Sequence, residues 1–192
     1  MKEQFFLEYL NRYIKLDDKE KNLILSNIET RRFLKGQYIL QQGDICRHEN
    51  FLISGSVKVF YVDQFGNQHV VMLAVEGWWV SDLGSLINKT KADYNIQCLE
   101  DTELFQISLE KLNYLYNHLP KLERFFRLII QKAFIASQKR IILNNSLSAK
   151  ERYKNFVINY PDLEQRIPQY LVASYLGMSK EFLSKIRSNI NS

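Results

Sequence analysis

Apolar positions follow a helical period at the start of the chain and a strand-like pattern after it. Phe6, Leu10 and Ile14 recur every four residues, which predicts a helix from about residue 2, and Asp17 is placed to open a second short helix. Between residues 30 and 98, runs of β-branched and aromatic residues alternate with glycine-containing turns. Many short strands within about 70 residues favour an antiparallel barrel or sandwich over alternating strands and helices.

The helical period returns after Asp101. Ser108 is placed to cap a helix that ends near His118, and Pro120 suits the first turn of a long helix of about 26 residues, or about 39 Å. Its apolar positions alternate by three and four as in a coiled coil. We expect them to pack against the same helix of a second subunit; the alternative is a helix that lies wholly against its own sheet. The expected dimer residues are Leu122, Phe126, Ile129, Ala133 and Ala136.

The end of the chain has the pattern of a helix, a tight turn and a second helix. A capping box from Ser148 to Glu151 first predicts a helix that ends at Tyr160-Pro161. After it, Gly177 separates two amphipathic segments, and Ser179 is placed to cap the second one. The apolar residues expected on the inner faces of these two helices are Leu171, Val172, Ala173, Tyr175, Leu176, Phe182, Leu183 and Ile186.

This pattern predicts a helix-turn-helix, whose second helix enters the major groove of DNA. Lys180 and Lys185 can donate to guanine or to phosphate, and Glu181 can accept from cytosine. The remaining residues expected at the DNA surface are Gln169, Ser179, Ser184 and Arg187. The alternative interpretation is an ordinary helical hairpin with a charged outer face.

The distribution of charge along the chain supports the interpretation as a DNA-binding helix-turn-helix. Of 192 residues, the first 119 carry 13 basic and 16 acidic side chains, whereas the last 73 carry 13 basic and 5 acidic ones. A basic rear half favours a polyanionic partner. No apolar run is long enough for a membrane span or a signal peptide, and the two cysteines are consistent with a reducing cytoplasm.

Nothing in the sequence indicates an enzyme or a metal site. No nucleophile motif, phosphate-binding loop or pair of carboxylates stands out. Cys46 and Cys98 cannot supply the four thiolates of an iron–sulfur cluster, and the three histidines are scattered. We therefore expect no metal and no resident cofactor.

Several motifs together resemble the Crp/Fnr family of transcription regulators over nearly the whole chain. Residues 35–44 and 51–59 are similar to the glycine-bounded strands of that family, and residues 173–187 are similar to its recognition unit. The resemblance implies an α+β fold. Its parts are a jelly-roll-like antiparallel β-barrel of the cyclic-nucleotide-binding type (1–119), a long dimerisation helix (120–145) and a helix-turn-helix domain (146–192). It also implies that Lys180, Lys185 and Glu181 correspond to the two arginines and one glutamate with which the family reads bases.

Two departures from the family pattern change the expectation. Members that bind cyclic AMP hold its ribose with a Gly-Glu pair and its phosphate with an arginine, whereas Ser81-Asp82 and Asp93-Tyr94 stand there in this chain. A carboxylate opposite a phosphate repels it, and the lost contact is worth about 100-fold or more in affinity. We therefore expect no tight binding of cyclic AMP. The short link from Pro161 to Pro168 also implies that the β-wing of the family is shortened or missing.

Another ligand could occupy the same region of the barrel. Aromatic rings beside the two departures could line an apolar or stacking pocket, and the alternative is that Trp78 and Trp79 are plain barrel core. The residues of this candidate effector pocket are Trp79, Ser81, Asp82, Leu83, Asp93 and Tyr94.

The sequence thus predicts a homodimeric, cytoplasmic transcription regulator that binds double-stranded DNA, without membrane association. RNA polymerase is a further candidate partner. The alternative is a small-molecule-binding module of the same fold that has lost specific DNA binding. The lysines leave that alternative open, because lysine lacks the planar donor fork of arginine.

Overall fold

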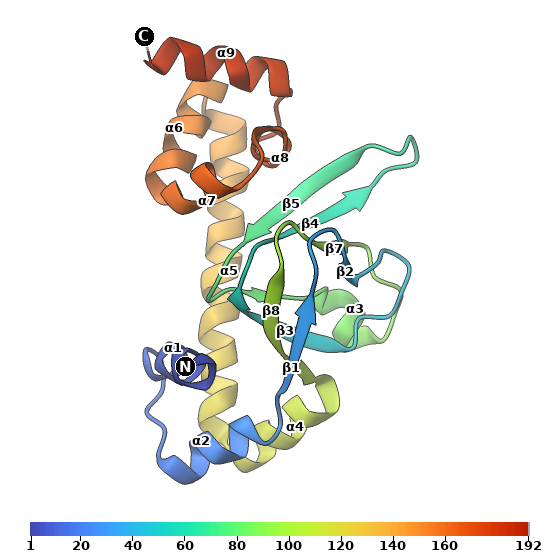
Figure 1. The fold of residues 1–192 in the computed structure, drawn as a ribbon, viewed down its shortest axis with the longest axis vertical. Helices are drawn as coiled ribbons and strands as arrows, with labels where there is room; N and C mark the ends of the chain where they lie inside the picture. Colours follow the sequence, from blue (N-terminus) through green and yellow to red (C-terminus); the bar gives the residue numbers. More distant parts are fainter. Residues whose placement is uncertain (192) are drawn as a thin grey trace.

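Two antiparallel sheets of four strands each face one another in the computed structural model, which describes residues 1–191 and the side chains of residues 1–189 (Figure 1). The strand orders are β1-β8-β3-β6 and β2-β7-β4-β5. This confirms the predicted antiparallel barrel. The strands are β1 (Glu29–Phe33), β2 (Tyr38–Leu40), β3 (His48–Ser54), β4 (Val57–Val62), β5 (Gln68–Ala74), β6 (Trp79–Val80), β7 (Asn95–Cys98) and β8 (Thr102–Ser108).

Alternation along β3 shows how the barrel is filled. Leu52 points between the sheets and packs with Ile96 and Leu104, all of which are fully buried. Phe51, one residue earlier, points to the outer face and packs with Phe6 of the first helix. Because successive side chains of a strand point to opposite faces, one strand serves two separate apolar clusters.

Helices cover the outer face of the first sheet. They are α1 (Lys2–Asn11), α2 (Asp18–Leu25), α4 (Leu109–His118) and α5 (Pro120–Ser146). The predicted caps are confirmed: Asp17 forms a capping box with Glu20, and Ser108 accepts from the amide of Lys111. The sequence did not indicate α3 (Leu83–Asn88), which has only six residues.

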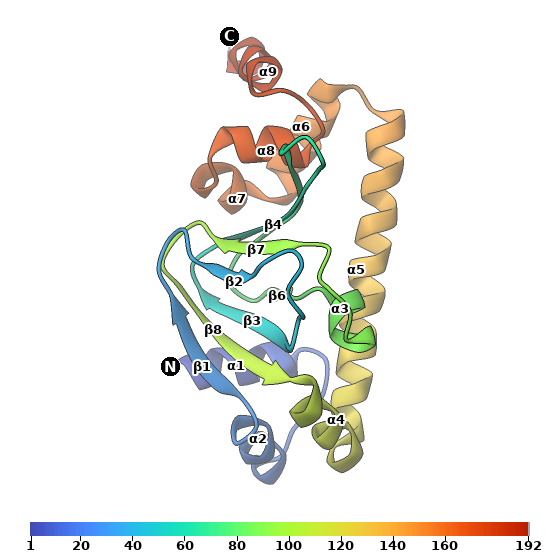
Figure 2. The same cartoon turned by 90° about the vertical axis from the view of Figure 1, so that its right-hand side faces the viewer.

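The long helix α5 joins the barrel to the last four helices. Figure 2 shows it running along one side of the molecule, from the level of α4 up to the C-terminal unit, which we define as residues 149–191. Its first turns carry Leu122, Phe125 and Phe126, which are at most 4% exposed and belong to the same cluster as Phe6. Packing therefore does not follow the expected boundary at residue 119, because α5 completes the core beneath the barrel.

The C-terminal unit contains α6 (Ala149–Asn159), α7 (Pro161–Arg166), α8 (Gln169–Tyr175) and α9 (Lys180–Asn191). Ser148 forms the predicted capping box with Glu151, whereas the short α7 was not predicted. Between α7 and α8 lie only Ile167 and Pro168, and no strand follows β8 within residues 1–191. The expected loss of the wing is therefore confirmed.

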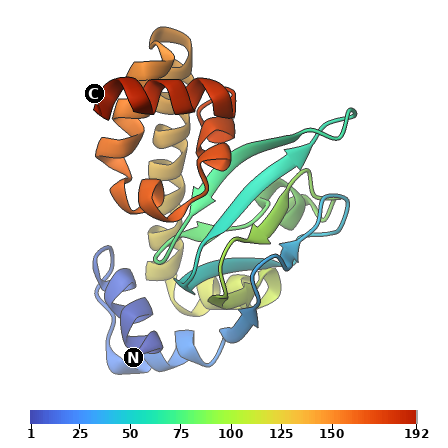
Figure 3. The same ribbon diagram turned by 45° about the horizontal axis from the view of Figure 1, so that its top comes forward.

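The C-terminal unit lies beyond one end of the barrel, where the β4–β5 hairpin reaches up beside it (Figures 1 and 3). α8 faces β5, and α9 lies on the outer side of the unit, away from the barrel. Among residues 1–191, no helix is both long and apolar enough to cross a membrane.

Candidate functional site

The turn between α8 and α9 has the geometry that the sequence indicates. Gly177 adopts a φ of +67°, a conformation that glycine reaches without steric cost. The amide of Met178 donates to the carbonyl of Ala173 at 3.0 Å, which closes the end of α8. Ser179 Oγ then accepts from the amide of Phe182 at 3.1 Å and caps α9.

Close packing fixes α9 against the rest of the C-terminal unit. Leu183 and Ile186 of α9 are 0% and 7% exposed, and they pack in one cluster with Val172 and the small Ala173 of α8. The predicted inner faces are confirmed at these positions. Phe182, however, was expected among them and is 50% exposed, so that prediction was wrong.

The outward face of α9 carries the polar side chains that the sequence predicts at a DNA surface. Lys180, Glu181, Ser184 and Lys185 are all exposed, and they lie at the end of the molecule farthest from α2 (Figure 1). The amide of Glu181 itself and the Ser179 hydroxyl hold the pKa of the Glu181 carboxyl below its ordinary value of 4.5. Glu181 is therefore ionised at neutral pH and can only accept hydrogen bonds.

Gln169 and Arg187 occupy a different environment. Both turn towards Glu164 of α7: Arg187 Nη2 lies 3.3 Å from Glu164 Oε1, and Gln169 Nε2 lies 3.3 Å from the Glu164 carbonyl. Tyr153 donates to the same carboxylate at 3.0 Å. These contacts brace α7, α8 and α9 against one another. The geometry gives no support to the prediction that Gln169 and Arg187 contact DNA.

In the candidate effector pocket, one carboxylate is already engaged by the protein itself. Asp82 is 3% exposed; its Oδ1 accepts from the amide of Ser85 at 3.0 Å and its Oδ2 from the amide of Asp93 at 2.8 Å. Asp82 therefore caps α3 and ties it to the segment that enters β7. The structure brings Asp82 and Asp93 together as predicted, but the oxygens of the Asp82 carboxyl group are taken up by backbone amides of the protein itself.

Trp79, one of the two aromatic residues of that pocket, lies elsewhere. The ring of Trp79 lies 4.9 Å from that of Phe126 and 5.2 Å from that of Phe51, within the cluster beneath the barrel. Ser81 hydrogen-bonds the buried Glu49. Of the remaining pocket residues, Tyr94 packs against the barrel interior and Leu83 is 39% exposed. The six predicted residues therefore do not converge on one space.

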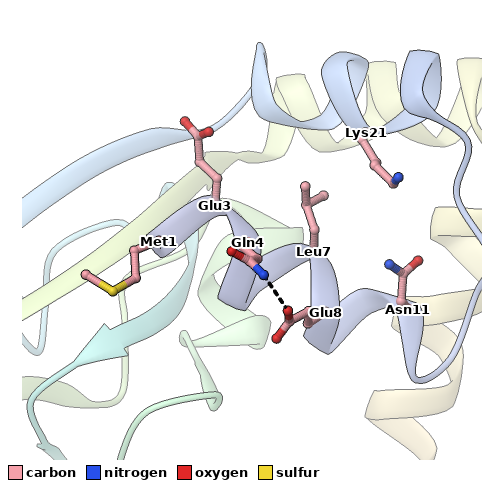
Figure 4. A pocket seen from close by; sticks show the side chains of 7 residues that line it. All are labelled: Met1, Glu3, Gln4, Leu7, Glu8, Asn11 and Lys21. Carbon is pink, nitrogen blue, oxygen red and sulfur yellow. Dashed lines mark hydrogen bonds between the residues drawn. The ribbon is translucent and has the colours of Figure 1, made fainter.

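Two surface hollows are lined by other residues. One, of about 390 Å³, lies between α1 and α2 and is lined mostly by polar side chains such as Gln4 and Glu8, which hydrogen-bond each other at 2.9 Å (Figure 4). The other, of about 210 Å³, lies beside Cys46, whose pKa is raised by burial. Raising that pKa keeps Cys46 a thiol at neutral pH, which makes it a poor nucleophile.

The surface of α5 is divided along its length. Leu122 and Phe126, both predicted at a dimer interface, are 1% and 4% exposed inside their own subunit, and Ile129 packs partly against the same cluster. They offer no comparable surface to a second chain. Every residue from 130 to 139 is exposed, including Ala133 and Ala136. The large apolar side chains on this stretch and the next turns are Ile130, Phe134, Ile135, Ile141, Ile142 and Leu143, at 37–63% exposure.

Comparison with known proteins agrees with this architecture. Residues 30–118 match the family model of the cyclic nucleotide-binding domain. The transcriptional activator protein Anr of Pseudomonas aeruginosa is 23% identical over 169 residues, which cover 81% of this chain and 68% of that protein.

Two solved structures share the fold. The catabolite activator protein of Thermus thermophilus has a TM-score of 0.60 and 22% identity, over 95% of this chain and 86% of that one. The c-di-GMP responsive global regulator CLP of Xanthomonas campestris has a TM-score of 0.71 and 19% identity, over 91% of this chain and 92% of that one.

Proposed function

We propose that this chain, which belongs to the Crp/Fnr family of transcription regulators, binds a two-fold symmetric DNA site as a dimer. The observation that carries the proposal is the outward face of α9, where Lys180, Glu181 and Lys185 are exposed while Leu183 is fully buried. A helix anchored in this way fits a major groove about 12 Å wide, with lysines donating to guanine and the glutamate accepting from cytosine.

The dimer is proposed to form through the exposed part of α5. Ile130, Phe134, Ile141 and Ile142 are 45–63% exposed on a helix that its own subunit leaves uncovered there. Contiguous apolar surface of this kind marks an interaction site, and a two-fold axis along α5 would cover it with the same residues of a second copy.

The β-barrel domain is proposed not to bind cyclic AMP tightly. The buried Asp82 carboxylate, which stands at the ribose-binding position, already accepts the amides of Ser85 and Asp93 and is not free for a ligand hydroxyl. Asp93 stands where the family places the arginine that holds the phosphate, so a ligand phosphate would meet a carboxyl group in place of a cation. Titration calorimetry of the purified protein with cyclic AMP should show no binding at micromolar concentrations. A dissociation constant in the micromolar range or below would contradict this part of the proposal.

The DNA proposal is tested by selection from a pool of random-sequence duplexes, followed by affinity measurements at fixed salt. A two-fold symmetric motif with half-sites about one helical turn apart is expected. Lys185→Ala should weaken binding to the selected duplex by about 1–3 kcal/mol, or roughly 5- to 150-fold, and relax the preference at one base position.

A matched control is Lys19→Ala in α2, because Lys19 is also exposed but lies at the opposite end of the molecule (Figure 1). This variant should bind as the unchanged protein does. Failure to enrich any motif, with or without an extract of small metabolites, would favour the alternative of a ligand-binding module without specific DNA binding. RNA polymerase stays a candidate partner. The protein is proposed to act in the cytoplasm, where it would reach chromosomal DNA.

A further inference from the structure

The C-terminal unit shares an apolar cluster with the barrel. Phe60, Val70 and Leu73 on the outer face of the second sheet are at most 4% exposed, and they pack in one cluster with Leu171 and Ile167 of the unit. Ser174 Oγ of α8 accepts from the amide of Val70 at 3.1 Å. The unit is therefore docked on the barrel by direct packing as well as by its chain connection through α5.

Arg166, the last residue of α7, adds an ionic clamp to this dock. Its Nη1 lies 2.8 Å from Glu76 Oε2 and its Nη2 lies 2.6 Å from Glu100 Oε2. The guanidinium also donates to Glu76 Oε1 at 3.1 Å. All three side chains are 33–37% exposed, so water screens the clamp only in part. A planar donor fork between two carboxylates fixes both distance and orientation.

The barrel side of the clamp is itself held in place. Glu76 lies in the turn after β5, and its Oε1 accepts from the amide of Gly55, in the turn after β3, at 2.9 Å. Gly55 has a φ of +91°, and a Cβ there would lie 2.6 Å from the carbonyl oxygen of Asp101, next to Glu100. The clamp therefore reaches three turns packed together at one end of the barrel.

The other flank of the dock is supported by α5. Arg140 donates to the carbonyl of Val71 in β5, and its guanidinium lies 4.5 Å from the ring centre of Tyr175 in α8. Tyr160, which precedes α7, contacts Trp78 of the barrel with a ring separation of 6.0 Å. Contacts on separate sides of the unit resist rotation better than one contact would.

We propose that Arg166 is a positioning residue for DNA binding: its clamp on Glu76 and Glu100 fixes the direction of α9 relative to the barrel and hence to the second subunit. The inference rests on the proposed function. Two recognition helices can occupy two half-sites at once only if their separation and direction match the DNA. Contacts of one α9 with one half-site do not depend on that match.

The test compares two duplexes. One is the palindrome selected by the unchanged protein, and the other has the same length with one half-site scrambled. Arg166→Ala should weaken binding to the palindrome about tenfold or more, because misaligned helices lose simultaneous engagement, and should change binding to the half-site duplex less than about twofold. Glu100→Gln should act in the same direction more weakly.

Lys154→Ala is the matched control, because Lys154 is an exposed cation of the same unit outside the clamp. If Lys154 contacts a phosphate, the variant should bind both duplexes more weakly by the same factor. If it does not, the variant should bind both as the unchanged protein does. Equal loss on both duplexes for Arg166→Ala, or no loss on either, would overturn the clamp proposal while leaving DNA binding intact. If Arg166→Ala does not fold, as judged by circular dichroism, Glu100→Gln decides by the same comparison. An unchanged protein that selects no duplex would instead overturn the proposed function.

Discussion

A carboxyl group with no ion-pair partner among the described residues lies within the barrel. Glu49 of β3 is 6% exposed, and burial raises its pKa from 4.5 to about 7, an effect that the Ser81 hydroxyl offsets only in part. The folded protein thus holds a proton on Glu49 that the unfolded chain releases at a lower pH. Its contribution to the free energy of unfolding is complete below about pH 4.5 and is lost progressively as the pH rises to about 7.

Glu49→Gln should remove this dependence, because the amide keeps the shape without titrating. The free energy of unfolding of the unchanged protein, minus that of the variant, should fall by up to about 3 kcal/mol between pH 4.5 and 7.5. Urea unfolding at several pH values measures this difference, and other titrating groups cancel in it. A difference that stays constant across the range would show that Glu49 is charged in the folded state.

Single residues were predictable where their partners lie nearby in the sequence. The capping roles of Asp17, Ser108 and Ser148 follow from bonds to residues three positions on. The roles of Arg166 and Arg187 do not, because their carboxylate partners lie 23 to 90 positions away or in a helix too short to recognise. An exposed cation on an outer face and one turned towards Glu164 have the same local sequence pattern.

At the scale of single elements, the second half of α5 carries large apolar side chains that its own subunit leaves exposed. We expect Phe134→Asp to raise the dissociation constant of the proposed dimer at least about 30-fold, or about 2 kcal/mol, because each subunit loses apolar contact and buries a carboxylate. Sedimentation velocity over a range of protein concentrations measures the change.

Phe65→Asp is the control for that experiment. Phe65 is 80% exposed at the tip of the β4–β5 hairpin, so the substitution makes the same chemical change away from α5. It should leave the association unchanged. A monomeric unchanged protein, or a Phe134→Asp variant that associates as before, would contradict the placement of the interface.

Elements of three or more helical turns were predictable because their apolar periods repeat. α5 begins at the expected proline and ends within one residue of the expected position. The six-residue helices α3 and α7 were missed, since one or two turns display no period. The split of α5 into a buried and an exposed half was also missed. Its apolar spacing is the same in both halves, and only the barrel decides which residues it covers.

For the whole molecule, the apolar cluster shared by the barrel and the C-terminal unit predicts that the two unfold together. Leu183 of α9 is fully buried in that cluster, and Leu183→Ala should cost about 2–5 kcal/mol. Both tryptophans belong to the barrel, and Trp78 also contacts Tyr160 of the C-terminal side. Their fluorescence therefore reports on the barrel and its contact with the C-terminal unit, whereas circular dichroism follows all helices. The two unfolding transitions should coincide and move together in the variant.

Lys154→Ala should leave both transitions within about 0.5 kcal/mol of the unchanged protein. A variant whose helical signal shifts while its tryptophan signal stays in place would show two independent units. The sequence predicted a domain boundary between residues 145 and 146. It could not show that outer-face residues of β4 and β5 complete the core of the other unit, because alternation marks a face as apolar without naming what covers it.

Because α5 is one continuous helix, a small tilt at one of its ends becomes a larger displacement at the other. Its 27 residues form a rod about 40 Å long, with its first turns embedded beneath the barrel and its last turn leading into the C-terminal unit. A tilt of about 5° at the embedded end would move the far end by about 3.5 Å, close to the rise of one base pair. A small repacking beneath the barrel would thus displace the far end of α5 by about the spacing of one base pair along the DNA.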